Sequence, residues 1–417
     1  MSNLLNDHKS KQNIKIAYIH AMTFPSREAN AFDAVWTAAA LSEKVDTTFF
    51  MSMLKISKSQ LKQYYGIIES SLRLQSMYLY YLPDRLKNRF RNCYGSFLSI
   101  FLRFHPSWEG FRGRKILYVR EPNELLFWGQ QKKRQKWLKD WTLCYEAHDP
   151  LGLNPNQFKR TNPFELQDGP EGRHRQAVLQ AALNFDIVIC NTQILADDLK
   201  SWTDNAIQPH FITLASELPR LSYPPRIRFG DKIVIGYIGT IDQYRGVHTL
   251  LAAVRLLPQN YKLRIVGRFR KEAGVDPNWL DKILGDTQIS DRVELIIENP
   301  IRDIAGEIDR CDIVLQPASS DILASRYAAP LKSFAYMVRG KPIVAADVRC
   351  HRDLFRDGES AVFYSLDPSS LADRITNLVN NPEEAERISR GAWEQAVDYS
   401  FSRRADEILS LVKGVDM

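Results

Sequence analysis

Two successive series of short apolar runs, separated by segments with apolar residues at helical spacing, dominate this chain. The first run, IKIAYIHA at residues 14–21, is rich in β-branched residues and almost continuously apolar, which favours a strand buried on both faces of a parallel sheet. AFDAVWTAAALSEK then has helical spacing, and VDTTFFMS reads as the next strand. This strand, helix, strand order is the βαβ unit of an α/β domain. Further strands are predicted at 115–121, 142–149 and 185–192.

The same order begins again after residues 216–230, a proline-containing segment without core periodicity that reads as a linker. We therefore predict two doubly wound α/β domains, at 14–215 and 231–397, with a polar arm at 1–13 and a helix at 398–417. A length of 417 residues also suggests more than one core. Open α/β sheets bind ligands beyond the carboxyl ends of their strands, so a cleft between two such ends is the expected site of function.

Residues from about 53 to 112 break this pattern with tyrosine-rich and arginine-rich segments of mostly helical period, which we interpret as an insertion or a set of lid helices. Basic and aromatic residues are mixed through 85–104, and a second basic cluster follows at 132–139. This combination suits an interfacial helix on an anionic membrane surface. A solvated helix face packed on the domain explains the same residues about equally well.

Composition limits the kinds of binding partner and the cellular compartment expected for this chain. A hydrophobic content of 44% and a charged content of 25% are those of a soluble globular protein. The net charge of +7 allows an acidic partner, but the basic residues are dispersed and no nucleic-acid module is recognisable, so no nucleic-acid partner is expected. The five cysteines are far apart and form no C-x-x-C pair, which indicates a reducing compartment and no structural zinc. No stretch approaches the ~18 apolar residues of a spanning helix, so we expect a cytoplasmic protein.

The loop GYIGTIDQYRGVHTLL, after the first strand of the second domain, is a candidate anion site. Gly236 and Gly239 allow a tight turn, and Gly246 lets the next helix begin close to a ligand. Arg245 places a permanent positive charge beside that helix start. Glycine loops and surface arginines are common, so this loop alone does not decide whether an anion binds here.

A second helix start, in APLKSFAYMVRGKPIVAAD, also favours an anion site. Pro330 suits the first turn of a helix and leaves the amides of Leu331, Lys332 and Ser333 without helical partners. Lys332 adds a positive charge there. A diphosphate would satisfy both helix starts and both cations.

Together with FPSREANAFDAV, YVREP, CYEAHDP and FDIVICNTQILADDL, these segments resemble the retaining glycosyltransferases of family 4. The resemblance runs from Ile14 to about Leu411, apart from 53–112. It implies the GT-B architecture, with two facing Rossmann-like domains, parallel sheets, an interdomain cleft, and a C-terminal helix that crosses back to the first domain. Such enzymes move a sugar from a nucleotide-diphosphate sugar to a hydroxyl acceptor, often lipid-linked, in cell-surface polysaccharide or glycolipid synthesis. They generally need no metal or other cofactor, and the chain has no Asp-x-Asp pair.

The resemblance also assigns roles to individual residues. It implies that His148, Arg245 and Lys332 are catalytic, with the two cations stabilising the charge that develops on the leaving diphosphate. The implied donor site comprises Gly239, Thr240, Arg245, Gly267, Arg268, Ala329, Pro330, Leu331, Lys332 and Ala335. The implied acceptor site comprises Arg27, Glu28, Asn30, Glu146, His148 and Asp149, and Asn30 is the expected cap of the helix that follows.

Three positions depart from the family pattern. Ala335 and Tyr327 stand where the family has two glutamates, and Thr240 replaces a basic residue. A methyl group cannot accept a hydrogen bond from a ribose hydroxyl, and losing such a charge-assisted bond costs about 1.5–3 kcal/mol, or roughly ten- to a hundredfold in affinity. An engineered change, a natural subfamily that holds ribose differently, and a catalytically degenerate sugar-nucleotide-binding protein all fit these residues.

Overall fold

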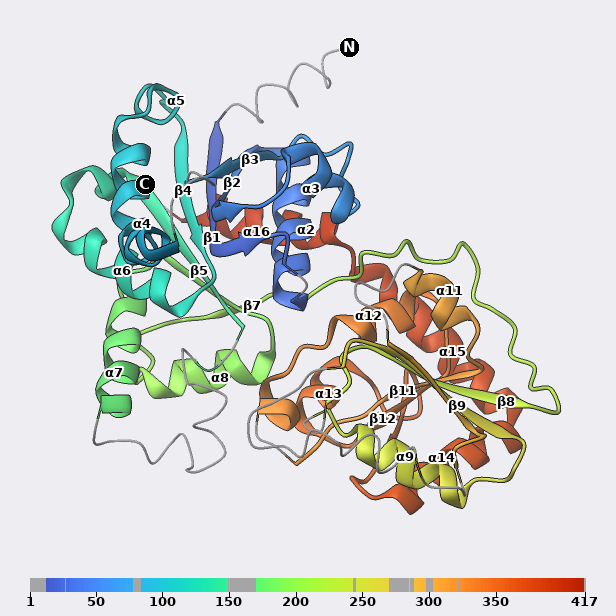
Figure 1. Ribbon diagram of the computed structural model, residues 1–417. Coiled ribbons are helices and arrows are strands. Elements are labelled where there is room, and N and C mark those ends of the chain that lie inside the picture. The colour runs from blue at the N-terminus through green and yellow to red at the C-terminus, as the bar shows by residue number, and fades with distance from the viewer. Residues whose placement is uncertain are drawn as a thin grey trace, which may run out of the picture. The chain divides into compact units, whose positions relative to one another are not determined.

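The computed structural model describes residues 13–26, 28–77, 84–148, 150, 170–242, 245–269, 285, 289–297, 303–320 and 323–415. The chain divides into two compact units (Figure 1). Met1–Leu214 and Phe401–Met417 form the N-terminal unit, and Ala215–Ser400 form the C-terminal unit.

The N-terminal unit is built on a seven-stranded sheet of order β3-β2-β1-β4-β5-β6-β7, in which every neighbouring pair is parallel. The strands are β1 (Ile14–Phe24), β2 (Asp46–Leu54), β3 (Arg73–Ser76), β4 (Arg114–Val119), β5 (Trp141–Ala147), β6 (Ile187–Cys190) and β7 (His210–Phe211). The first seven residues of β1 are all buried, as its apolar run predicts for a central parallel strand. The strand order reverses between β1 and β4, and ligands of open α/β sheets bind at such a reversal.

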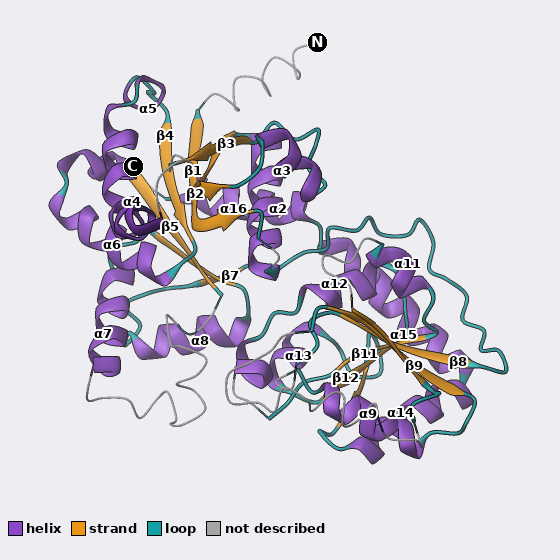
Figure 2. Ribbon diagram, viewed as in Figure 1, coloured by secondary structure: helices purple, strands orange, loops and turns teal. Residues whose placement is uncertain are grey.

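Helices cover this sheet (Figure 2). They are α2 (Ala29–Lys44), α3 (Lys58–Tyr64), α4 (Asp84–Phe104), α5 (Pro106–Glu109), α6 (Pro122–Arg134), α7 (Pro170–Ala182), α8 (Gln193–Trp202) and α16 (Phe401–Gly414), with a 3-10 turn at Lys136–Asp140. The last helix comes from the far end of the chain. Ala405, Ile408 and Val412 of α16 join the hydrophobic core that contains α2, so the two helices lie side by side (Figure 1).

The C-terminal unit is built on a six-stranded parallel sheet of order β10-β9-β8-β11-β12-β13. Its strands are β8 (Ile233–Ile238), β9 (Tyr261–Gly267), β10 (Val293–Ile297), β11 (Ile313–Gln316), β12 (Ile343–Ala346) and β13 (Val362–Tyr364). Its helices include α9 (Val247–Leu256), α11 (Ile304–Asp309), α12 (Leu331–Val338), α13 (Arg349–Leu354), α14 (Pro368–Asn380) and α15 (Pro382–Gln395), with shorter turns at Leu323–Tyr327 and Ala396–Asp398. Here the order reverses between β8 and β11.

The predicted fold class, α/β with two parallel sheets, is confirmed. The segment interpreted as a helical insertion differs in one respect, because it contributes β3 to the edge of the sheet. Among the helices that the structure describes, none combines the length and apolarity needed to cross a bilayer.

Candidate functional site

Glycines shape the turn that follows β8 in the C-terminal unit. Gly246 precedes α9 with a φ of +72°, and a Cβ atom on it would lie 2.4 Å from the carbonyl oxygen of Ala318. A Cβ atom on Gly267 would lie 1.8 Å from the carbonyl oxygen of Gly239. Only glycine permits these approaches, which bring the ends of β8 and β9 and the start of α9 together at the strand-order reversal.

Arg245 lies beside this turn and is held by one carboxylate. The Asp242 side chain accepts from the Arg245 backbone amide at 2.8 Å and from Nε at 3.3 Å. Asp242 is almost fully buried, whereas the Arg245 side chain is 39% exposed. The buried partner therefore fixes the guanidinium without removing it from solvent.

Lys332 lies against the same turn from α12. Its Nζ donates to the Tyr237 hydroxyl at 3.1 Å and lies 4.4 Å from the centre of that ring. The Tyr237 hydroxyl in turn donates to the carbonyl oxygen of Thr240 at 2.6 Å. A Cβ atom on Gly239 would lie 3.2 Å from Lys332 Cδ, so the lysine stem covers the glycine.

Burial lowers the pKa of Lys332 well below its ordinary value, the charge of Arg245 lowers it further, and Asp242 partly opposes both effects. Arg245 and Lys332 are thus close enough to repel each other across one short turn. An anion between them would relieve that repulsion, which is the electrostatic requirement for binding a diphosphate.

The start of α12 differs in detail from the prediction. Pro330 is the N-cap, one residue before the first helical residue, Leu331. The amide of Ser333 donates to the carbonyl oxygen of Pro330 at 3.0 Å, so it is not a free donor as predicted. The amides of Leu331 and Lys332 therefore remain as the predicted donors to an anion at this helix start.

The two positions that lack the family's acids are both buried. Ala335 is 2% exposed and Tyr327 is 1% exposed. The hydroxyl of Tyr327 accepts from Arg326 Nε at 3.2 Å. Of the other predicted donor residues, Arg268 directly follows β9 and its carbonyl oxygen accepts from the Ile241 amide at 2.8 Å. Ala329 is half-buried, immediately before Pro330.

In the N-terminal unit, four buried charged side chains form one network. Arg120, just after β4, pairs with Asp33 of α2, and Arg404 of α16 pairs with Glu146 of β5. Arg404 also donates to the carbonyl oxygens of Ile212 at 3.0 Å and Thr213 at 2.5 Å. All four side chains are no more than 2% exposed. Two guanidinium groups therefore balance two carboxylates at the carboxyl end of the sheet.

Burial by itself raises the pKa of Glu146, but the charges of Arg404 and Arg120 outweigh it and hold that pKa well below the ordinary value. The buried hydroxyl of Tyr118 also donates to Glu146. Glu146 is therefore an ionised acceptor.

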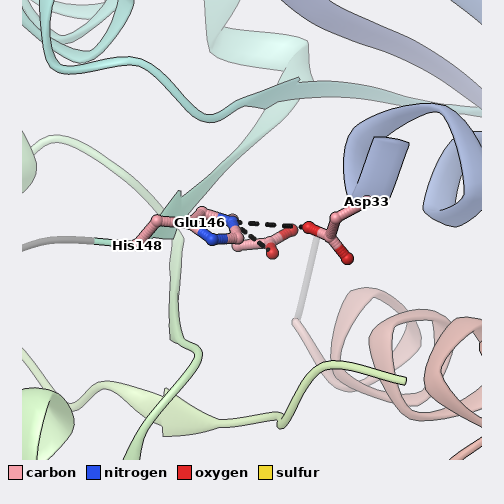
Figure 3. A group of neighbouring side chains, drawn as sticks. All are labelled: Asp33, Glu146 and His148. Carbon is pink, nitrogen blue, oxygen red and sulfur yellow. Dashed lines mark ion pairs between the residues drawn. The ribbon is translucent and has the colours of Figure 1, made fainter. Parts of the chain in front are cut away.

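His148 is directed into this network (Figure 3). Its Nε2 lies 2.7 Å from Glu146 Oε1 and 3.9 Å from Asp33 Oδ2, and its Nδ1 lies 3.1 Å from Asn191 Nδ2. Arg120, which can only donate, also contacts this nitrogen, with its Nε at 3.1 Å. Nε2 therefore lies between a carboxylate acceptor and a guanidinium donor, while Nδ1 faces the Asn191 side-chain amide. The ring remains 22% exposed, so one face is accessible to a ligand.

Asp33, Glu146 and His148 form the group within the described residues whose ligand atoms lie close enough for a metal ion. Two arginines already neutralise the two carboxylates. A divalent cation would add two charges to a buried cluster with no remaining negative charge, so the donor set does not fit a metal centre.

Two further predicted acceptor residues, Glu28 and Asn30, lie at the start of α2. Glu28, rather than Asn30, is the N-cap, and it makes no side-chain capping bond. Asn30 is exposed within the first turn, and its carbonyl oxygen accepts from Arg120 at 3.1 Å. The helix begins two residues earlier than an Asn30 cap requires, so that prediction was wrong. Arg27 and Asp149 lie outside the described residues.

Sequence reasoning missed Asp33, Arg120, Asn191 and Arg404. Arg120 is the middle residue of the quoted YVREP run and directly follows β4, and charged residues at strand ends of an α/β sheet were a usable signal. Arg404 lies about 250 residues beyond Glu146, and nothing in the local sequence links the two. The contacts of Arg120 with Asp33 and of Arg404 with Glu146 arise from the tertiary fold.

A family profile described as "Glycosyl transferases group 1" matches residues 223–395. The chain is 24% identical over 251 residues to a D-inositol 3-phosphate glycosyltransferase of Stackebrandtia nassauensis, covering 55% of this chain and 54% of that protein. It is 21% identical over 268 residues to the protein of the same name from Corynebacterium urealyticum, covering 59% and 62%. The alignments thus span little more than half the length of these relatives.

Solved structures extend the similarity of fold to almost the whole chain. HepE of Anabaena in complex with UDP has a TM-score of 0.68 at 13% identity, covering 96% of this chain and 99% of that one. Sucrose-phosphate synthase from Thermosynechococcus elongatus has a TM-score of 0.69 at 16% identity, covering 96% and 98%. The chain therefore has the GT-B fold, and its residues 223–395 are similar to the glycosyl transferases of group 1.

Proposed function

We propose that this protein is a glycosyltransferase that moves a sugar from a nucleotide-diphosphate sugar to a hydroxyl acceptor with retention of anomeric configuration. The observation that carries this proposal is the placement of Arg245 and Lys332 beside the Tyr237–Thr240 turn. That turn lies at the strand-order reversal, where an α/β sheet binds its ligand. HepE, of the same fold, has been solved with UDP and with UDP-glucose, which favours a nucleotide-sugar donor here.

The proposed chemistry depends on the leaving diphosphate. Its negative charge grows as the bond to the anomeric carbon breaks, and Arg245, Lys332 and the first amides of α12 are fixed donors for that charge. Donors that need no reorganisation stabilise a transition state more than a ground state. In the proposed reaction no enzyme carboxylate attacks the sugar. The acceptor hydroxyl attacks the anomeric carbon from the face that the diphosphate leaves, and its proton passes to the leaving diphosphate oxygen.

The N-terminal unit is the proposed acceptor side. His148 is held by Glu146 and Asn191 and remains partly exposed, so it can make a directed contact with a sugar hydroxyl. We propose that transfer needs no metal, because arginine charges already balance the Asp33–Glu146 pair and the cations of the other unit can neutralise the diphosphate.

The direct test is release of nucleoside diphosphate from a panel of nucleotide sugars, with and without a hydroxyl acceptor. Arg245→Ala should lower the rate by about 10²–10³, the usual effect of removing one charge-stabilising donor. Arg390→Ala, an exposed arginine of the same unit paired with Glu386, is the control and should leave the rate unchanged. Equal rates for the two variants would remove Arg245 from the reaction.

A second candidate, a sugar-nucleotide-binding protein without catalysis, is favoured by the burial of Ala335 and Tyr327. Neither position offers an acid that could accept a hydrogen bond from a donor hydroxyl. Ala335→Glu separates the candidates. If the chain is an altered enzyme, the restored carboxylate should raise donor affinity by roughly ten- to a hundredfold and raise turnover with it. Donor binding without turnover in both forms would instead support the binding protein.

We also propose that the enzyme works at the cytoplasmic face of a membrane on a lipid-linked glycan acceptor. Phe97, Ile100 and Phe104 of α4 are 42%, 58% and 57% exposed and recur at helical spacing on one face. Exposed apolar rows of this kind insert into the headgroup region of a bilayer. Four cysteines are free thiols, which suits a reducing compartment: Cys144, Cys190, Cys311 and Cys350.

Sedimentation with liposomes of anionic and neutral lipid tests this attachment. Ile100→Asp with Phe104→Asp should abolish binding to anionic liposomes. The matched control, Ile68→Asp with Leu256→Asp, changes residues that are 64% and 58% exposed elsewhere and should bind normally. Equal sedimentation of both double variants would contradict membrane attachment through α4.

A further inference from the structure

A cavity of about 440 Å³ lies in the N-terminal unit at the outer edge of its sheet. It is lined by Thr48, Phe50, Lys58, Lys62, Leu72, Arg73, Leu74, Gln75, Phe101, His105, Ser107 and Trp108. Thr48 and Phe50 pair with Arg73 and Gln75 across β2 and β3 and so share one face of the sheet, whereas Leu72 and Leu74 belong to the core on the other face. The cavity therefore follows the edge of β3 itself, the terminal strand of the sheet.

The wall formed by α3 is positively charged. Lys58 and Lys62 are four residues apart on this helix and both line the cavity. Like charges at this spacing destabilise a helix, so local helix stability does not explain the pair. No carboxylate lines the cavity.

These two lysine charges are not neutralised within the described part of the unit. Lys62 donates only to the uncharged carbonyl oxygen of Ser70, at 2.6 Å. Lys58 has no hydrogen-bond or ion-pair partner among the described residues. Arg73, by contrast, is paired with Asp46. Two unneutralised ammonium groups on one wall are suited to an anionic group of the ligand.

The wall formed by Phe50, Phe101 and Trp108 is aromatic. Phe50 and Trp108 are buried, and the ring of Phe101 packs edge-on to Phe50 at a centroid distance of 5.8 Å. The volume is within the range of small-molecule sites, and pockets of that class combine an apolar lining with a few placed polar groups. One wall therefore suits an anion and the other an apolar body.

From this pairing we propose that the cavity binds an anionic amphiphile, with the phosphate or other anionic head on Lys58 and Lys62 and the apolar body against Phe101 and Trp108. The sheet-edge cavity is separate from the Asp33–His148 network and from the Arg245–Lys332 turn, and none of its lining residues belongs to either. The inference therefore does not require the proposed transferase activity.

The test is isothermal titration of the full chain with decyl phosphate below its micelle concentration, with decanol and inorganic phosphate as separate ligands. Decyl phosphate should bind more tightly than either, because each of the others satisfies one wall only. Lys58→Gln with Lys62→Gln should weaken it about tenfold. Lys55→Gln with Lys200→Gln removes the same charge from exposed positions outside the cavity and should leave the affinity unchanged.

All four lysines are on the surface or half-buried, and melting curves of the variants establish that each is folded. The proposal is overturned if the two double variants bind decyl phosphate equally, if decanol binds as tightly as decyl phosphate, or if decyl phosphate does not bind. Displacement of decyl phosphate by excess UDP would also overturn it, because that result would place the anion at the turn of the C-terminal unit.

Discussion

Lys332 is the residue whose charge state should reveal how the turn binds its ligand. Burial and Arg245 lower its pKa in the free protein, and a bound diphosphate would raise that pKa again. Above the lowered pKa, binding must therefore take up a proton, and affinity should fall by up to about tenfold per pH unit as the pH rises. Titration of UDP in buffers of different ionisation enthalpy measures that uptake.

The matched variant is Lys332→Arg, because a guanidinium stays charged across the whole range. It should remove the proton uptake and flatten the pH dependence of UDP affinity. An unchanged slope in Lys332→Arg would mean that another group takes up the proton.

His351 should make the C-terminal unit sensitive to acid. It is buried, donates from Nδ1 to the carbonyl oxygen of Ala346 at 2.9 Å, and lies 3.2 Å from Gln316 through Nε2. Burial lowers its pKa from 6.5 to about 4. As the pH falls through 6.5 towards 4, the unfolded state gains a proton that the folded state refuses, so stability is lost in this window, by about 3 kcal/mol in total.

Urea unfolding at pH 7.5 and pH 4.5 measures that loss. His351→Gln has no titrating group at this position and should show a smaller difference between the two pH values. If the parent and the variant lose equal stability, His351 does not contribute to the acid sensitivity.

Among individual site residues, the sequence predicted Arg245 and Lys332, because both flank glycine or proline signals at helix starts. The structure brings both to one turn. It did not predict Arg120 or Arg404, whose partners are 87 and 258 residues away in sequence. Their roles depend on distant pairing, which periodicity and local motifs do not encode.

Among the elements, α16 is the one whose role depends most on a single side chain. Arg404 is the largest charge influence on Glu146, and it also holds the carbonyl oxygens of Ile212 and Thr213, directly before the chain leaves this unit. Arg404→Gln leaves Glu146 with one guanidinium fewer and should destabilise the N-terminal unit by about 3–5 kcal/mol, the usual cost of breaking a buried pair.

Its neighbour supplies the control. Arg403 is half-exposed and pairs with Glu407 along the surface of α16, so Arg403→Gln should change stability by no more than about 0.5 kcal/mol. Chemical unfolding of the two variants compares them directly. Equal stability would show that the buried network does not anchor the helix.

Long, buried elements were predicted well. β1 and β8 are central strands, and continuous burial gives them an apolar run that is visible in the sequence. β3 and β7 were missed because they are short edge strands of four and two residues with little continuous burial. The start of α2 was misplaced because Asn30 looked like a cap, whereas tertiary contact with Arg120 uses its carbonyl group instead.

For the whole molecule, the alternation of apolar runs and helical segments was sufficient to predict two parallel α/β sheets, because a parallel strand requires a crossover and a buried position. The choice of nucleotide base, sugar and acceptor depends on a few loop contacts, and the fold alone does not fix them. The central proposal is that the turn at Tyr237–Thr240, with Arg245 and Lys332 beside it, binds a nucleoside diphosphate.

The most direct test is thermal unfolding of the full chain with a panel of nucleoside diphosphates, UDP included, repeated for Arg245→Ala and Arg390→Ala. At least one diphosphate should raise the melting temperature, by an amount equivalent to about 2.7 kcal/mol at a concentration of 100 times its dissociation constant. That shift should persist in Arg390→Ala and largely disappear in Arg245→Ala. Absence of a shift with every diphosphate, or an equal shift in both variants, would contradict the account.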